Sequence, residues 1–143
     1  MTESRLIEIL PHIYIGNCSD ELLEHNNITN IININSSKKN YQNYNTLNIA
    51  VTEMEEFVHS DDFINLDFNT MNDFIVEILK KNEKVVICDN ATSIAFAGSC
   101  SFILKFIGMS FTNTITYVQR KMNLDIKTIP QILIFQLFEY YTK

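Results

Sequence analysis

Four short stretches of the chain have the apolar, β-branched character of strands. His12 to Gly16 alternates in polarity and ends at a glycine, and Asn30 to Asn35 alternates isoleucine with asparagine. Leu47 to Val51 is a third candidate. Lys84 to Cys88 is continuously apolar after its lysine, which is typical of a parallel strand buried on both faces. These patterns predict four strands.

Apolar residues recur every three or four positions in the longer segments, as they do on one face of a helix. Serine, threonine or aspartate stands where most of these helices would begin, because such side chains accept hydrogen bonds from the free N–H groups of the first turn. The predicted helices are Ser19 or Asp20 to His25, Asp61 or Asp62 to Lys81, Thr92 or Ser93 to Ile107, Ser110 or Thr112 to Met122, and Pro130 to Tyr141. The polar segment from Ser36 to Asn45 is predicted to be a loop.

Strands that alternate with helices predict an α/β fold, in which helices flank both faces of a central, mostly parallel β-sheet. The 143 residues, 46% of them hydrophobic, suffice for the core of one domain that spans residues 1–143. Ligands of such sheets bind at the carboxyl ends of the strands. We therefore look for chemistry in the turn that follows Cys88.

The charge balance argues against several classes of function. Eleven lysines and arginines face seventeen aspartates and glutamates, which gives a net charge of −6 and no cationic surplus for nucleic acid or anionic membranes. No apolar run is long enough to span a membrane, and the first residues lack the pattern of a secretion signal. We expect a cytoplasmic protein that binds neither nucleic acid nor membranes.

Cysteines and histidines lack the spacing of metal ligands. The cysteines are Cys18, Cys88 and Cys100. We expect them to be reduced, buried thiols of an intracellular protein, because their number is odd and they are far apart. The histidines are His12, His25 and His59. They are scattered in the same way, so we expect neither a metal nor another cofactor.

A strand, a tight turn and a helix start follow one another between Lys84 and Gly98. This arrangement suits an anion, since backbone N–H groups converge there and the helix dipole favours negative charge. A guanidinium that clamps the anion would have to come from Arg5 or Arg120, the two arginines of the chain. Neither arginine lies in the segment itself.

Fragments spread over nearly the whole chain resemble one family, in the same order. They are Pro11–Asn17, Ile28–Asn33, Ile49–Glu53, Asp73–Ile75, Gly108–Ser110 and Gln136–Tyr140. In these segments the sequence is similar to the small dual-specificity protein phosphatases, which are cysteine-dependent enzymes. The resemblance implies their fold, and it places the turn after Cys88 at their phosphate-binding loop.

The catalytic signature of that family is His-Cys, five residues, then Arg and Ser or Thr, with a glycine inside the loop. Aligned without a gap, Cys88 falls at the histidine, Asp89 at the nucleophile and Ala95 at the arginine. Glu53 falls at the general acid, which is an aspartate in the family. The degenerate loop consists of Cys88, Asp89, Asn90, Ala91, Thr92, Ser93, Ile94 and Ala95, with Thr92 at the glycine and Phe96 after the loop.

These replacements remove the two groups on which the chemistry depends, a thiolate that attacks phosphorus and a guanidinium that holds its oxygens. Asp89 puts a carboxylate where phosphate should lie, and two anions about 4 Å apart repel by roughly 4 kcal/mol at an effective dielectric of 20. Ala95 supplies no compensating charge. We expect a pseudophosphatase without catalytic residues. Asp89 is expected to fill the site and to accept hydrogen bonds from the loop N–H groups as a helix cap.

Two enzymatic alternatives remain. In a shifted register Cys88 is the nucleophile, and Ile94 then stands at the arginine position. In the other, Asp89 is an aspartyl nucleophile, which needs a metal or another cation to admit the phosphate. Either alternative predicts residual or altered phosphatase activity.

A chain without catalysis is expected to bind a protein partner, as a scaffold or as a competitor of active relatives. Phe135 to Tyr141 is apolar enough to pack against a partner or a second copy, so a homodimer is a candidate. The acidic residues between Glu53 and Asp62 are an alternative surface for a basic partner. The richness in asparagine and isoleucine is typical of AT-rich genomes, such as those of large DNA viruses or protists. A viral protein would act in the host cytoplasm or as a virion subunit.

Overall fold

The computed structural model describes residues 6–35, 43–50, 68–89 and 92–142 of the chain. A five-stranded sheet in the order β1-β2-β5-β3-β4 lies within these residues. The strands are β1 Leu6–Leu10, β2 Ile13–Gly16, β3 Asn30–Asn35, β4 Asn45–Ala50 and β5 Val85–Asp89. β2, β5, β3 and β4 run parallel, and β1 runs antiparallel to β2. The predicted α/β fold with a mostly parallel sheet is confirmed.

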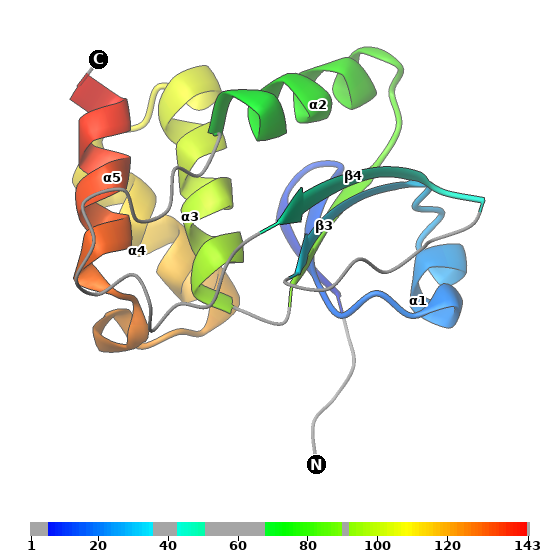
Figure 1. Ribbon diagram of the computed structural model, residues 1–143, viewed down its shortest axis with the longest axis horizontal. Coiled ribbons are helices and arrows are strands. Elements are labelled where there is room, and N and C mark those ends of the chain that lie inside the picture. The colour runs from blue at the N-terminus through cyan, green and yellow to red at the C-terminus, as the bar shows by residue number, and fades with distance from the viewer. Residues whose placement is uncertain (1–5, 36–42, 51–67, 90–91, 143) are drawn as a thin grey trace.

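Helices flank the sheet on both sides (Figure 1). They are α1 Asp20–His25, α2 Phe68–Lys80, α3 Thr92–Phe102, α4 Phe111–Met122 and α5 Gln131–Thr142. A π-helical turn, η2 Ile103–Ile107, continues α3, and a short 3-10 turn, η3 Ile126–Thr128, precedes α5. In Figure 1, α1 lies at one end of the molecule, whereas α3, α4 and α5 stand together at the other.

The two faces of the sheet are covered unequally. Side chains alternate along a strand, so Val85 and Ile87 of β5 enter a large core shared with α2, α3, α4 and α5. Val86 and Cys88 point the other way, into a small cluster that includes Leu23 of α1. β5 is therefore buried on both faces, which explains its continuous apolar sequence.

Amide pairs hold the edge strand β4 in register with β3. Asn33 Nδ2 donates to Asn48 Oδ1 at 2.8 Å, and Asn45 Nδ2 donates to Asn30 Oδ1 at 3.0 Å. Asn30 and Asn33 are almost completely buried, and each lies opposite its partner in the parallel ladder. A slip of one residue would separate both pairs, so the asparagines of the alternating Ile-Asn pattern fix the pairing of these strands.

The ends of several helices are formed by the residues that the sequence indicates. Ser19 Oγ accepts from the Leu22 N–H and Ser110 Oγ from the Asn113 N–H, both at 3.2 Å. Gly108 closes η2 with a left-handed φ of 81°, a conformation that glycine adopts without steric cost. The predicted helices near residues 19–25 and 110–122 are confirmed.

Three features differ from the predictions. β1 was not predicted, because Leu6–Leu10 is a short apolar run that gains its partner through the turn at His12, where φ is 75°. β4 begins at Asn45, inside the predicted loop. The end of the helix predicted to reach Ile107 is a π-helical turn from Ile103. The predicted helix start at Asp61 or Asp62 and most of the predicted loop lie outside the described residues.

Candidate functional site

The end of β5 and the start of α3 lie at the carboxyl edge of the sheet. β5 is the central strand, with β2 on one side and β3 on the other, and Asp89 is its last residue. α3 begins at Thr92. The structure thus brings a buried strand, a short connection and a helix start together, as predicted for the anion-binding turn.

The described side chains of the degenerate loop are mostly buried. Ile94 and Ala95, in the first turn of α3, have no exposed surface and belong to the large core. Ser93 is half-buried, and Cys88 is 3% exposed. The position aligned with the phosphate-clamping arginine of the resembled family is therefore occupied by a methyl group packed in the core.

Other candidate positions lie outside what the structure describes. Residues 90 and 91, which are Asn90 and Ala91, and the aligned general acid Glu53 are outside the described residues. For Asp89 and Thr92 the backbone is described but the side chain is not. Helix capping by the Asp89 carboxylate stays a prediction.

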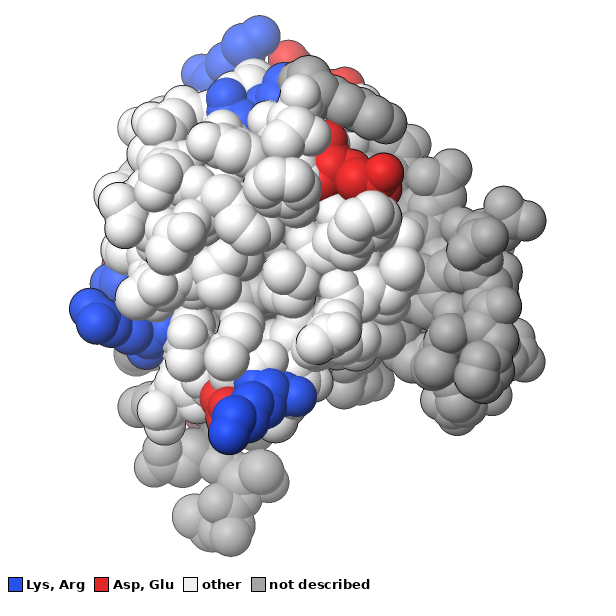
Figure 2. All heavy atoms as spheres, turned by 90° about the vertical axis from the view of Figure 1, so that its left-hand side faces the viewer, with Lys and Arg blue, Asp and Glu red and all other residues white. Residues whose placement is uncertain are grey.

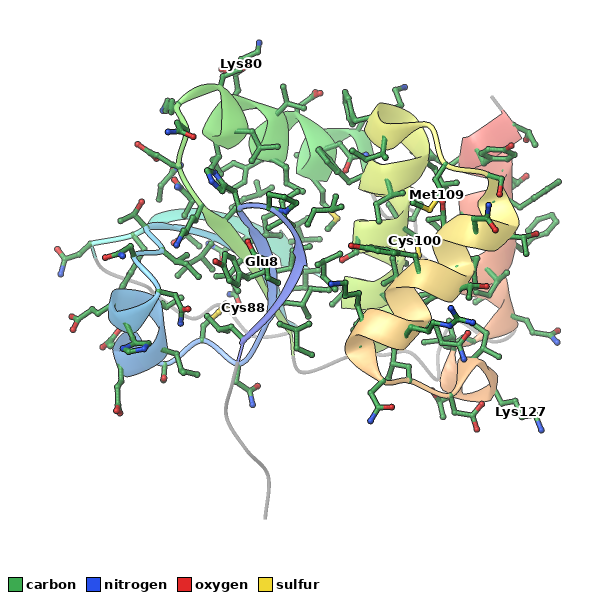
Figure 3. All side chains as sticks on the ribbon, turned by 180° about the vertical axis from the view of Figure 1, so that it is seen from behind. Glu8, Lys80, Cys88, Cys100, Met109 and Lys127 are labelled. Carbon is green, nitrogen blue, oxygen red and sulfur yellow. A yellow bond between two sulfur atoms is a disulfide. The ribbon has the colours of Figure 1, made fainter. Side chains whose placement is uncertain are left out.

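A disulfide joins Cys18 and Cys88, with 5.7 Å between their Cα atoms. Cys18 follows β2, Cys88 lies near the end of β5, and Gly16 of β2 is directly opposite Cys88 in the parallel ladder. Figure 3 shows Cys88 on the sheet, on the side of α1. The expectation that all three cysteines are reduced is wrong for this pair, because neighbouring parallel strands place their ends side by side.

Cys100 is the free, buried cysteine among the described residues, as predicted for it. It lies on α3 within the large core, away from the disulfide (Figure 3). Burial raises the pKa of the Cys100 thiol, because the core disfavours its charged form. A thiol held in its neutral form is a poor nucleophile.

A groove that the sequence did not predict runs along α4. It has a volume of about 560 Å³, and its described lining comprises Met109, Asn113, Thr116, Tyr117, Arg120 and Lys121. Arg120 is one of the two arginines of the chain. The structure therefore places this guanidinium on α4, and the described lining contains none of the loop residues whose side chains the structure describes.

The described residues hold neither a cluster of metal ligands nor a membrane-spanning helix. They contain no group of three or more His, Cys, Asp and Glu side chains able to hold a metal ion. In the same part of the chain, no helix is long and apolar enough to cross a membrane.

Comparison with known proteins identifies structural neighbours. Neither a protein-family model nor a curated protein matches this sequence. The human tyrosine phosphatase-like serine/threonine/tyrosine-interacting protein superimposes with a TM-score of 0.76 at 22% identity, over 98% of this chain and 97% of that one. DUSP15 gives a TM-score of 0.81 at 20% identity, over 97% and 88% of the two chains.

Human DUSP28 is a further neighbour, with a TM-score of 0.75 at 14% identity over 98% of this chain and 94% of its own. These likenesses extend over whole chains at low identity, so they concern the arrangement of the backbone. They agree with the fold that the sequence fragments imply. This chain has the fold of the dual-specificity phosphatases.

Proposed function

We propose that this chain is a catalytically inactive phosphatase-like protein that acts by binding another protein. The observation that carries the proposal is the burial of Ala95 in the first turn of α3. The alignment puts this residue where the enzymes of this fold hold phosphate oxygens with a guanidinium. A buried methyl group offers neither charge nor hydrogen bonds to a phosphate.

Asp89 also supports the proposed inactivity, because it replaces the nucleophile. It ends β5, at the position of the attacking cysteine in the alignment. A carboxylate there repels an incoming phosphate, and we propose that it accepts hydrogen bonds from the loop amides in place of a ligand.

Cys88 is a poor substitute for the missing nucleophile. Its sulfur is bonded to that of Cys18, and its side chain is 3% exposed. Phosphoryl transfer requires a free thiolate within reach of the substrate, so this route would require reduction of the disulfide and exposure of the sulfur.

Protein binding is supported by the name of one structural neighbour. That protein is described as tyrosine phosphatase-like and as an interacting protein, and its whole chain superimposes on this one. By analogy with it, we propose a scaffolding or competing role for this chain.

A hydrolysis assay tests the loss of catalysis. We expect purified protein to hydrolyse p-nitrophenyl phosphate no faster than buffer, with or without dithiothreitol, because both the nucleophile and the clamp are replaced. Cys88→Ser and Asp89→Ala serve as matched variants, and an active dual-specificity phosphatase serves as the positive control. Activity of the unmodified chain that disappears in either variant would show that it is an enzyme.

The binding role needs its own experiment. We expect the tagged chain, purified from its native source under gentle conditions, to retain a second protein in a fixed ratio, which mass spectrometry identifies. Loss of that protein when the tagged chain is replaced by an unrelated domain of this size is the control. A chain that is inactive and also purifies alone contradicts the binding role while leaving the inactivity intact.

A further inference from the structure

The C-terminal helix α5 exposes three large rings along one side. Phe135 is 57%, Phe138 48% and Tyr141 42% exposed, at intervals of three residues that keep them close on the helix surface. Phe111 of α4 joins them, with its ring centroid 5.3 Å from that of Phe138 and 5.7 Å from that of Tyr141. We call these four residues the aromatic face.

Among the residues that the structure describes, charged side chains are scarce around the aromatic face. Within α5, Gln131–Thr142, Glu139 is the one charged residue. Figure 2 views the side of the molecule on which α5 lies and shows a broad uncharged surface, with Lys, Arg, Asp and Glu towards its margins. A protein that covers this surface can exclude water from the rings without burying a charge.

The exposed rings are large enough for the centre of an interface. A ring of this size presents about 200 Å² when fully exposed, so the three exposed fractions leave roughly 300 Å² on one copy. A standard interface buries roughly 800 Å² on each partner, with an apolar centre and a polar rim. The aromatic face thus supplies more than a third of the area that a stable dimer needs.

The charge of a partner determines how well it can bind the aromatic face. Two copies of a chain with a net charge of −6 repel each other, and that repulsion is weakest where they meet through an uncharged surface. A strongly basic or acidic partner, by contrast, finds little to pair with on α5. Rings at regular spacing on one helix can also interdigitate with the same rings related by a two-fold axis.

We propose that the aromatic face is the contact surface of a two-fold symmetric homodimer of this chain, formed by α5 and the start of α4. This proposal goes beyond the inactive loop and does not depend on it. The rings of each copy fill the spaces between those of the other, and water leaves both apolar surfaces.

Sedimentation velocity over a range of concentrations tests the proposal. We expect the full chain to sediment at twice its mass of 16.6 kDa at about 100 µM and to dissociate on dilution. Phe135→Asp and, separately, Phe138→Asp are expected to weaken the dimer by at least about tenfold, since each puts a charge into the apolar centre. Phe135 is the more exposed ring, so its replacement perturbs the monomer least.

His25→Asp is the matched control, because it adds a charge at an exposed position of α1, at the opposite end of the molecule (Figure 1). It is expected to leave the dimer unchanged, and circular dichroism checks that all three variants fold. A full chain that stays monomeric at every concentration overturns the proposal, even if the face then binds a different protein. A dimer that survives both aromatic replacements in folded protein also overturns it.

Discussion

At the scale of single residues, the disulfide between Cys18 and Cys88 is the feature with the largest chemical consequence. It ties the segment between β2 and α1 to the end of the central strand, across a sequence separation of 70 residues. A cross-link over so long a loop restricts the unfolded chain strongly, which favours the folded state. It also removes Cys88, the cysteine of the degenerate loop, from the pool of free thiols.

Removal of this bond should lower stability. Cys18→Ser is expected to reduce the free energy of unfolding by about 2–4 kcal/mol relative to the oxidised protein, since the unfolded chain regains its freedom. Urea unfolding followed by circular dichroism measures the change. Dithiothreitol should destabilise the unmodified chain by a similar amount and the variant hardly at all. Equal stabilities of the oxidised protein and the variant would refute this.

The structural role of a single residue could be predicted from sequence where that role depends on its chain neighbours alone. Ser19 or Asp20 and Ser110 or Thr112 were predicted as helix starts, and the structure shows Ser19 and Ser110 as the caps, because capping depends on a few neighbouring backbone groups. The Cys18–Cys88 pairing was missed because it depends on which strands are neighbours. Hydrophobic periodicity carries no information on strand order, so only the pairing of β2 with β5 could have indicated it.

At the scale of elements, a network of polar side chains joins three helices. Asn72 of α2, which is 1% exposed, donates from Nδ2 to Tyr140 Oη of α5 at 3.0 Å. Tyr140 Oη in turn donates to Asn69 Oδ1 at 3.1 Å. Ser101 Oγ of α3, which donates to the Gly98 carbonyl at 2.7 Å, lies 3.4 Å from Asn72 Oδ1. The network fixes how α2, α3 and α5 meet.

Loss of the Tyr140 hydroxyl should therefore lower the stability of the fold. Tyr140→Phe leaves the buried Asn72 amide without this acceptor, and we expect it to lower the free energy of unfolding by about 1–3 kcal/mol. Chemical denaturation measures the loss. Tyr141→Phe removes a hydroxyl from a neighbouring, more exposed ring and should change stability much less. Equal effects of the two replacements would show that the network does not contribute.

The elements themselves were largely predictable, because each long helix and each parallel strand carries its own periodicity. Pro130 and the apolar spacing after it indicated α5, for example, and the apolar run from Lys84 indicated β5. β1 was missed because it is short and needs β2 beside it. The widening of α3 into a π-helical turn at Ile103 has no sequence signal that we recognise.

At the scale of the whole molecule, the hydrophobic cores on the two faces of the sheet differ in size. Most buried side chains belong to the large core, whereas the cluster beneath α1 consists of Tyr14, Leu23, Ile28, Ile31, Val86 and Cys88. α1 is itself a helix of six residues, too short to be stable without its packing. The disulfide lies on the face with the small cluster, so it stabilises the region with the smaller core.

Hydrogen exchange should reveal this difference. Reduction of the disulfide is expected to speed amide exchange in α1 more than in α3 or α5, because α1 loses a covalent anchor next to its small core. Mass spectrometry of peptides from oxidised and reduced protein measures the rates. Uniform acceleration over all helices would mean that the bond stabilises the molecule as a whole and not this side of it.

The architecture and the position of the candidate site could be predicted from sequence because the motif fragments keep their order along the chain. The site's chemistry could be predicted only as far as residue types allow. Burial of Ala95 and the bonding of Cys88 depend on packing and strand order, which no local pattern encodes.

The central place of β5 has a consequence for biosynthesis. Of the described strands it is the last to leave the ribosome, yet it lies between β2 and β3, which are made much earlier. Until it arrives, the backbone N–H and C=O groups along one edge of β2 and of β3 lack their common neighbour, and such unpaired edges invite pairing with other chains. Polypeptides whose synthesis stops before residue 85 should therefore aggregate and depend on chaperones.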